Sequence, residues 1–210
     1  MNLEQFFNKL DRLGEHIPLM SLQEMLKELT VADHEIAEFG SFHTDRYQRN
    51  RLRRSDHYEA LFLCFEAGQR TPIHDHAGSA CGVKVLMGVG TETVFARTED
   101  GWLYATGSRQ LPTGGVVGSN DMDTHQLSNL QPHGGRLVTL HIYSPPLGEV
   151  GNYSLDDNGA IHVRATVNER PFRAMHEPST GHRSCGECDG SGRCGTENRP
   201  VTITVDQQPC

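Results

Sequence analysis

The 210-residue sequence lacks any apolar run near the roughly 20 residues that a membrane-spanning helix needs. Residues 1–5 show neither the basic nor the apolar stretch of a secretory signal peptide, so we expect a cytoplasmic protein. Positive charge is scarce as well. The 19 Lys and Arg stand against 27 Asp and Glu, and the net charge of −8 argues against a nucleic-acid or anionic-membrane binder. In the cytoplasm, the six cysteines indicate thiols or metal ligands rather than disulfides.

The first forty residues are predicted to be helical. Ser21 and Glu24 form a capping-box pattern before a second apolar stripe. We therefore expect two short amphipathic helices over 1–40, packed on the main domain through their apolar sides. The first apolar stripe recurs at helical spacing and consists of Leu3, Phe6, Phe7, Leu10 and Leu13.

Short apolar segments bounded by Gly, Pro, Asn and Asp dominate the chain from about residue 57 to 170. No helical segments alternate with them, which argues against a parallel sheet and favours an all-β sandwich or barrel over residues 41–172. The predicted strands are 59–66, 71–76, 82–89, 91–97, 102–106, 125–130, 136–144 and 160–167.

Residues 173–210 form a Gly- and Cys-rich tail with few large apolar side chains. The run from Cys185 to Cys188 and beyond resembles one CxxCxGxG repeat of a DnaJ-type zinc finger. Cys194, His182 or Cys210 could complete a zinc site or share an ion between two chains. A flexible thiol-bearing tail and a redox CxxC pair are the alternatives, and the tail could also contact a partner.

Two histidines, His74 and His76, flank Asp75. In a strand, residues i and i+2 point to the same face, so both imidazoles would converge on one point, as a metal chelate requires. Pro72 favours an extended entry to this segment. The alternative is a pair of surface or hydrogen-bonded histidines.

The spacing G-x5-H-x-H-x4-C-x6-G, from Gly68 to Gly88, resembles the first motif of the cupin superfamily. His125 and Asn129 resemble the end of the second cupin motif. The resemblance implies a double-stranded β-barrel, or jelly roll, with a metal inside. Cys81 stands where most cupins carry a Glu ligand, which leaves three neutral histidine ligands.

Three neutral ligands leave both positive charges on a divalent metal, and this favours an anionic co-ligand such as a substrate thiolate. They also leave coordination positions open for substrate and O2, as oxygen-activating non-haem iron requires. Zinc or nickel could bind the same imidazoles, so the ligands alone do not identify the metal.

Strand alternation in 139-TLHIYSPP-146 places Thr139, His141 and Tyr143 on one face and the two aliphatic residues between them on the other. If this polar face is buried, its groups must hydrogen-bond one another or a ligand. The alternative is a strand side that faces solvent.

These features together resemble the cysteine dioxygenases, three-His iron cupins that oxidise L-cysteine with O2 to cysteine sulfinic acid. The matching segments cover residues ~40–150 in order. The resemblance implies Fe(II) on His74, His76 and His125. The segments are 47-YQRN-50, 73-IHDH-76 with Cys81, 83-VKVLMG-88, His125 and 141-HIYSPP-146.

The resemblance also implies roles for four further residues. Tyr143 would stand beside the iron and the O2 substrate, and His141 would hydrogen-bond it. Thr139 takes the place of a serine that is common in the family. In one branch of the family, a thioether joins the tyrosine to a cysteine at the position of Cys81, and both partners are present here.

Arg49 would hold the substrate carboxylate with its two-pronged guanidinium, with Tyr47 beside it at the substrate. Relatives that prefer 3-mercaptopropionate carry Gln at this position, so Arg49 favours cysteine. Without the resemblance, the basic cluster could equally be a solvated turn, or a phosphate contact. Its other members are Arg46, Arg51, Arg53 and Arg54.

The leading hypothesis is thus an Fe(II) enzyme, expected as a monomer, whose partners are L-cysteine and O2. Oxidation of another small thiol is the enzymatic alternative. The alternative from a different class is a non-catalytic cupin that senses a metal or thiol.

Overall fold

The computed structural model describes residues 1–120, 123–153, 155, 160–163 and 168–169. All of them belong to one of the two units into which the chain divides, Met1–Ala174. The predicted zinc ligands Cys185, Cys188 and Cys194 lie outside the described residues. The division of the chain after residues 40 and 172 stays a prediction. Among the described residues, no helix has both the length and the apolar character that crossing a bilayer requires.

Three helices precede the strands: α1 (Leu3–Leu13), α2 (Leu19–Glu28) and α3 (Asp33–Phe39). The prediction of two helices missed α3. The capping box predicted at Ser21 is wrong, because α2 begins at Leu19 directly after Pro18. A capping box instead starts α1, where the Asn2 side chain accepts from the Gln5 backbone N–H at 2.8 Å and the Gln5 side chain accepts from the Asn2 N–H at 3.1 Å.

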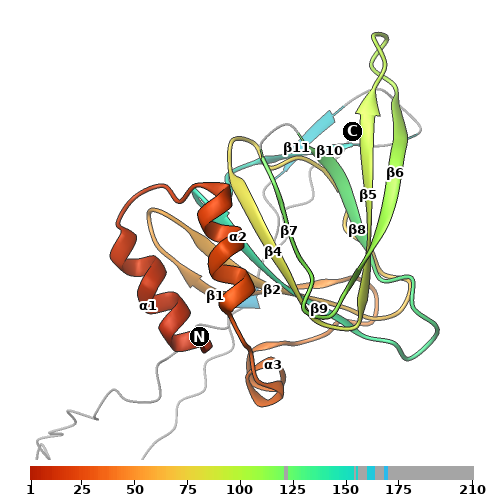
Figure 1. Ribbon diagram of the computed structural model, residues 1–210. Helices are drawn as coiled ribbons and strands as arrows, with labels where there is room; N and C mark the ends of the chain where they lie inside the picture. The colour runs from red at the N-terminus through yellow and green to blue at the C-terminus, as the bar shows by residue number, and fades with distance from the viewer. Residues whose placement is uncertain (121–122, 154, 156–159, 164–167, 170–210) are drawn as a thin grey trace, which may run out of the picture. The chain divides into compact units, whose positions relative to one another are not determined.

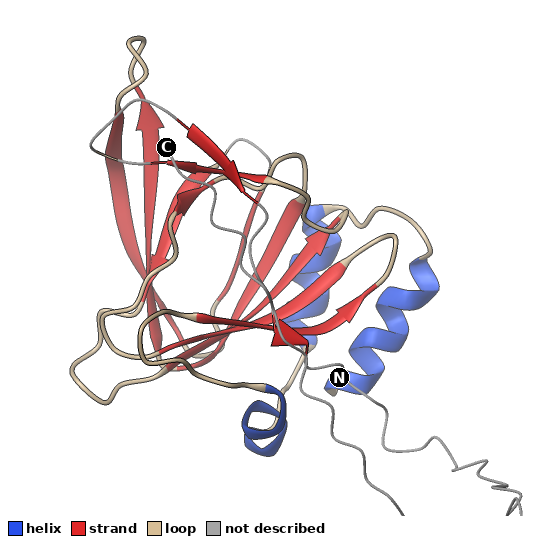
Figure 2. Cartoon of the chain, turned by 180° about the vertical axis from the view of Figure 1, so that it is seen from behind, coloured by secondary structure: helices blue, strands red, loops and turns tan. Residues whose placement is uncertain are grey.

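The strands form two six-stranded sheets, and this confirms the predicted cupin double-stranded β-barrel (Figures 1 and 2). The first sheet has the spatial order β12 (Asn168–Glu169), β1 (Gln48–Arg54), β2 (Glu59–Phe65), β9 (Leu137–Ser144), β4 (Ala80–Met87) and β7 (Val116–Ser119). The second has the order β11 (Ala160–Val163), β10 (Val150–Tyr153), β3 (Ile73–His74), β8 (Thr124–Ser128), β5 (Val89–Arg97) and β6 (Leu103–Pro112).

Strand β1 was not predicted, because its sequence is rich in arginine and reads as a basic turn. Its arginines find acidic partners that are distant in sequence. Arg51 and Arg54 lie 2.6 and 3.0 Å from the buried carboxylate of Glu59, and Arg53 lies 3.3 Å from Asp11. The strands β7 and β10 were missed as well, and β3 is shorter than the predicted 71–76.

The central strands β2 and β9 of the first sheet are buried along their whole length, so both of their faces are covered. Alternate side chains of β2 divide between two hydrophobic clusters. Ala60 and Phe62 belong to the cluster that contains the three helices, whereas Leu61 and Leu63 face the barrel interior. Figure 1 shows α1 and α2 on the side of this sheet that faces away from β5 and β6. The helices thus shield the outer face and leave the inner face to the site.

Helix α2 packs on β4 and β7, and a buried lysine ties its end to the sheet. The Lys84 ammonium on β4 donates to the carbonyl oxygens of Leu26 at 2.8 Å and Leu29 at 2.6 Å. Leu26 lies in the last turn of α2 and Leu29 is its C-cap, so both carbonyls lie at the helix end, where backbone acceptors lack an i+4 donor. The Leu26 carbonyl also accepts from the Leu29 N–H at 3.3 Å.

We expect Lys84→Met to lower the free energy of unfolding by about 1–3 kcal/mol, because buried carbonyls would lose their donor. The measurement is urea unfolding, with a lower midpoint and an unchanged m-value. Lys27→Met, on the exposed side of α2, is the matched control and should leave the midpoint nearly unchanged. Equal midpoints for the two variants would contradict the role of Lys84.

Candidate functional site

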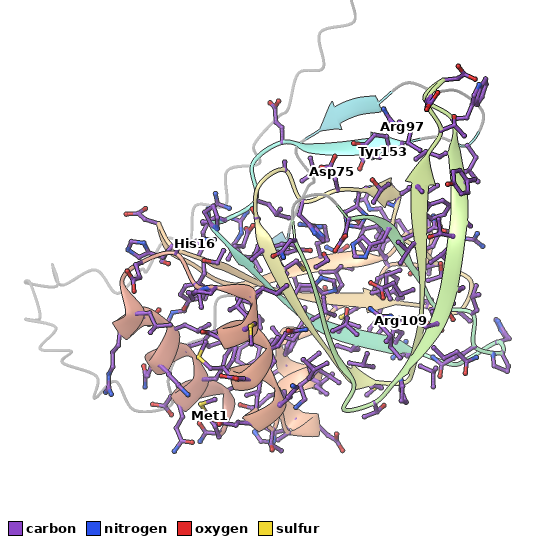
Figure 3. The ribbon with its side chains drawn as sticks, turned by 45° about the horizontal axis from the view of Figure 1, so that its top comes forward. Met1, His16, Asp75, Arg97, Arg109 and Tyr153 are labelled. Atoms are coloured by element: carbon purple, nitrogen blue, oxygen red, sulfur yellow. The ribbon has the colours of Figure 1, made fainter. Side chains whose placement is uncertain are left out.

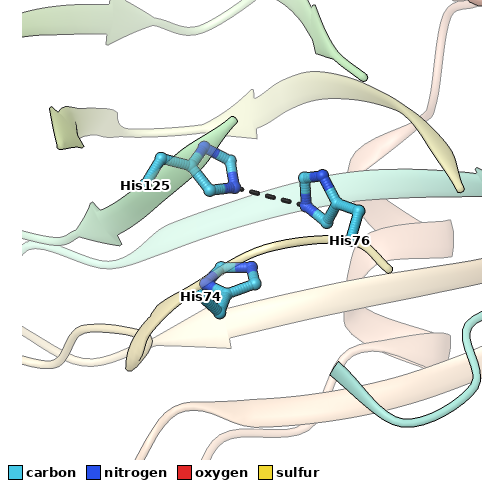
Figure 4. A group of neighbouring side chains, drawn as sticks. All are labelled: His74, His76 and His125. Atoms are coloured by element: carbon cyan, nitrogen blue, oxygen red, sulfur yellow. Dashed lines mark hydrogen bonds between the residues drawn. The ribbon is translucent and has the colours of Figure 1, made fainter. Parts of the chain in front are cut away.

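Three histidines converge inside the barrel, and their ligand atoms all lie within 4.8 Å of one another. His74 on β3 pairs directly with His125 on β8, and the Nε2 atoms of His125 and His76 are 3.3 Å apart (Figure 4). Two imidazole nitrogens that share a metal at about 2.0–2.1 Å lie roughly 3 Å apart. The separation of His76 and His125 is therefore that of two ligands of one ion.

His76 lies between the end of β3 and the turn that follows it. Strand β3 ends at His74, so the predicted strand through both histidines is wrong. The chain turns through Ala77 and Gly78, both with positive φ, and the Ser79 N–H donates to the His76 carbonyl at 3.0 Å. Gly78, at φ 91°, adopts a conformation that side chains disfavour. The imidazole of His76 is fully buried, and the Ser119 hydroxyl lies 2.9 Å from its Nδ1.

Each histidine has its Nδ1 occupied by a hydrogen bond, which leaves Nε2 for the common centre. The partners of Nδ1 are the Pro72 carbonyl at 3.0 Å for His74, the Ser119 hydroxyl at 2.9 Å for His76 and the Glu92 carboxylate at 3.0 Å for His125. Such outer hydrogen bonds fix the tautomer and ring orientation of metal-bound histidines. The residues present therefore fit a divalent metal ion.

The imidazoles of His74 and His76 are also in the protonation state that a metal requires. Burial, followed by the neighbouring His125, lowers the pKa of His74 to about 3. Burial, followed by the neighbouring His74, lowers the pKa of His76 to about 2. At neutral pH both rings are uncharged and keep a lone pair for coordination. Burial opposes ionisation of Glu92, but hydrogen bonds from His125 and Arg109 outweigh it and lower its pKa.

The polar face of β9 is buried and forms a hydrogen-bonded row, as strand alternation predicts. The Thr139 hydroxyl lies 2.9 Å from Nε2 of His141, and the Tyr143 hydroxyl lies 3.1 Å from Nδ1 of the same ring. Burial lowers the pKa of His141 and raises that of Tyr143, so the row is uncharged at neutral pH. The Tyr143 ring lies 5.6 Å from the His76 ring and connects the row to the histidine group.

Cys81 on β4 is the direct cross-strand partner of Tyr143 on β9. Its Sγ lies 3.8 Å from Nδ1 of His141, the nitrogen that the Tyr143 hydroxyl also contacts. Burial raises the pKa of the Cys81 thiol, which therefore stays protonated. Within the described residues, the candidate metal group contains the three histidines without Cys81.

Arg49 differs from the other arginines of its cluster. It lies on β1 and is only 9% exposed, and within the described part of the chain no carboxylate pairs with it and its Nε has no hydrogen-bond partner. Burial lowers its pKa, but the electrostatic influence of Tyr143, Tyr47 and the Glu59 carboxylate, together with a hydrogen bond to Tyr47, outweighs this effect and raises it. The Tyr47 ring stacks on Phe65 at 5.2 Å. The structure thus brings a buried cation next to the phenol of Tyr143.

Three residues of this site were not identified from the sequence. Ser119 comes from the unpredicted strand β7, and Glu92 and Arg109 come from the paired strands β5 and β6. The signal that could have revealed Glu92 is its position in 89–97, where strand alternation places it on the same side as the buried Gly90. Its partners are 33 and 17 residues away, so the sequence did not reveal the contacts.

Comparison with known proteins identifies one family. The sequence model of the family described as cysteine dioxygenase type I matches residues 5–156. The cysteine dioxygenase type 1 of Bos taurus is 30% identical over 137 residues, which cover 63% of this chain and 68% of the relative. The protein of the same name from Homo sapiens is 28% identical over the same shares.

Among solved structures, an uncharacterized conserved protein with a double-stranded β-helix domain from Klebsiella pneumoniae aligns with 62% of this chain and 95% of its own. The identity is 12% and the TM-score is 0.43, so the fold assignment rests on the strand order rather than on this alignment. The sequence match to the dioxygenase model, in contrast, extends over well over half of the chain. This chain belongs to the cysteine dioxygenase type I family.

Proposed function

We propose that this protein is an Fe(II)-dependent dioxygenase that converts L-cysteine and O2 into cysteine sulfinic acid. Both oxygen atoms of O2 enter the product, in which sulfur carries two oxygens and one of these oxygens carries the acidic proton. One observation carries the proposal. The three-histidine group shares the buried barrel interior with a guanidinium and a hydrogen-bonded phenol, which suit a small substrate with a thiol and a carboxylate.

His74, His76 and His125 would hold the iron. When bound, Fe(II) supplies the one-electron chemistry that O2 needs to react with a thiol. The neutral imidazoles do not compensate the charge of a divalent ion, so the site favours a thiolate over a neutral thiol.

Arg49 would bind the substrate carboxylate. A buried guanidinium without a carboxylate partner has lost its hydration, and an incoming anion restores charge-assisted hydrogen bonds to it. Tyr47 would line the same pocket, because its phenol hydrogen-bonds Arg49 and raises the pKa of the guanidinium.

The row on β9 would direct a proton donor into the site. If Thr139 donates to Nε2 of His141, Nδ1 carries the ring proton and donates to the Tyr143 oxygen. The Tyr143 hydroxyl is then free to donate a hydrogen bond to oxygen on the substrate side. Since burial keeps the phenol protonated, it can stabilise negative charge that develops there.

The proposed enzyme is a cytoplasmic monomer whose partners are L-cysteine and O2, as expected from the sequence. It binds neither nucleic acid nor a membrane. The net charge of −8 supports the last two points.

The decisive experiment is anaerobic loading with Fe(II), followed by O2 uptake with cysteine, 3-mercaptopropionate and cysteamine. We expect the highest kcat/KM for cysteine and a sulfinic acid product. Faster turnover of 3-mercaptopropionate would reassign the substrate. An iron-loaded protein that consumes no O2 with any thiol would contradict enzymatic function and favour a sensing cupin.

Removal of any one histidine ligand should remove most bound iron and nearly all activity, because two ligands lose both affinity and the three-fold arrangement. His125→Ala tests this by iron content and O2 uptake. His133→Ala, an exposed histidine, is the control and should behave as the wild type. Normal iron content and turnover in His125→Ala would reject the site.

Arg49→Gln should reduce kcat/KM for cysteine by some tens-fold, or on the order of 2 kcal/mol, through loss of a charge-assisted contact. It should also narrow the preference for cysteine over 3-mercaptopropionate. Arg51→Gln is the matched control, because Arg51 pairs with Glu59. Unchanged kinetics in Arg49→Gln together with an inactive Arg51→Gln would show that Arg51, and not Arg49, binds the carboxylate.

We further propose a thioether between Cys81 and Tyr143, whose strands pair at these residues. Its formation breaks the S–H bond and one ring C–H bond and joins sulfur to the ring carbon. The two protons and two electrons that are released pass to O2, which is reduced to H2O2. Iron, O2 and cysteine should therefore yield a fraction of the chain that is lighter by two hydrogens, and peptide mapping should locate the loss.

Cys81→Ser should abolish this mass change and reduce activity without eliminating it, since the bond would only fix the tyrosine in place. Tyr143→Phe should be more damaging, because it also removes the phenol hydroxyl. A wild-type protein that keeps its full mass after many turnovers would disprove the cross-link.

A further inference from the structure

A buried carboxylate connects one histidine of the site to the surface of the barrel. Glu92 lies on β5, and its side chain is only 7% exposed. Its Oε1 lies 3.0 Å from Nδ1 of His125, while its Oε2 accepts from Nε and Nη2 of Arg109, both at 2.6 Å. Each carboxylate oxygen therefore has its own cationic or N–H partner.

Arg109 lies on β6, directly opposite Glu92 in the strand register, and its side chain is 57% exposed. Figure 3 shows Arg109 on the β5–β6 side of the barrel, away from the helices. The guanidinium is thus the outer end of a chain of contacts from the surface to His125.

The other two histidines have neutral Nδ1 partners, the Pro72 carbonyl and the Ser119 hydroxyl. His125 alone among the three has a charged partner. A carboxylate behind a metal-bound imidazole fixes its tautomer and increases its basicity. Placed so near the centre, it also adds negative charge that attracts a cation and repels an anion.

We propose that Glu92 and Arg109 are a positioning pair with opposing effects on this site: Glu92 strengthens metal binding, and Arg109 cancels its charge so that the metal still attracts an anionic co-ligand. This inference rests on the proposed metal-binding role of the three histidines. Neither residue is a ligand, and both act through His125.

The two residues should therefore respond differently to removal of charge. Glu92→Gln loses the negative charge behind His125, and metal affinity falls. Arg109→Gln leaves that charge without compensation, so the metal binds at least as tightly while an added anion binds more weakly.

The test uses Co(II) as the probe and titrates the purified full chain. Visible absorption reports metal binding, and a second titration with azide reports affinity for an anion. We expect the Co(II) dissociation constant of Glu92→Gln to rise by about 10- to 100-fold. For Arg109→Gln we expect an equal or lower Co(II) dissociation constant and a several-fold higher azide dissociation constant.

Arg109→Lys keeps the positive charge, so its azide dissociation constant should be close to that of the wild type and lower than that of Arg109→Gln. Arg12→Gln removes the same charge from the exposed side of α1 and should change neither constant. Thermal midpoints of the metal-free variants separate the proposal from a purely structural role, which would lower stability and leave both constants unchanged.

The pairing would be overturned if the Co(II) dissociation constants of Glu92→Gln and Arg109→Gln shifted with the same sign, or if only their thermal midpoints shifted. Tight Co(II) binding by the wild type would still support the metal site in that case. Failure of the wild type itself to bind Co(II) would overturn the metal site together with the pairing. Because Arg109 is largely exposed, its variants keep the test decisive even if Glu92→Gln does not fold.

Discussion

The register of β9 with its two neighbours is the constraint on which the rest of the structure depends. This strand pairs with β2 on one side and β4 on the other, and all of its residues are buried. Its polar row faces the barrel interior, while Leu140 and Ile142 pack in the cluster that contains the helices. A shift of one residue would exchange the two faces and bury Thr139, His141 and Tyr143 against apolar helices. Packing of α1 and α2 therefore also fixes the position of the site.

Hydrogen bonding inside the barrel is nearly complete, and this makes the exception informative. The Nδ1 atoms of the three histidines, the row on β9 and Glu92 all have partners at 2.6–3.1 Å. Among the described residues, Nε of Arg49 is the buried side-chain atom left without one. Leaving a buried charged donor unsatisfied costs free energy that a bound anion would recover. On the proposed function, a substrate carboxylate would supply an acceptor for this guanidinium.

Sequence reasoning succeeded where a local period determines the structure and failed where distant partners do. The period of two in 139–143 predicts the polar row correctly, and the spacing of His74 and His76 predicts their convergence. The predicted strand bounds were wrong, because β3 ends at His74 and His76 lies beyond it. The arginines of β1 were not interpretable locally, since Glu59 and Asp11 neutralise three of them from other elements. Arg49 was identified only through family resemblance.

The charges around the three histidines explain why a thiol that also carries a carboxylate suits this interior. Cys81 takes the place of the Glu that most cupins carry as a ligand, and here the Glu92 carboxylate lies one hydrogen bond behind His125 and is paired with Arg109. Burial keeps the thiol of Cys81 and the phenol of Tyr143 protonated, so neither adds negative charge. A divalent ion would then keep both positive charges, and Arg49 adds a third. On the proposed function, a thiolate at the metal and a carboxylate at Arg49 meet two cationic positions at once, and the substrate itself brings most of the compensating negative charge. Small thiols without a carboxylate would compensate only the first position, which gives the interior a physical basis for discriminating between substrates.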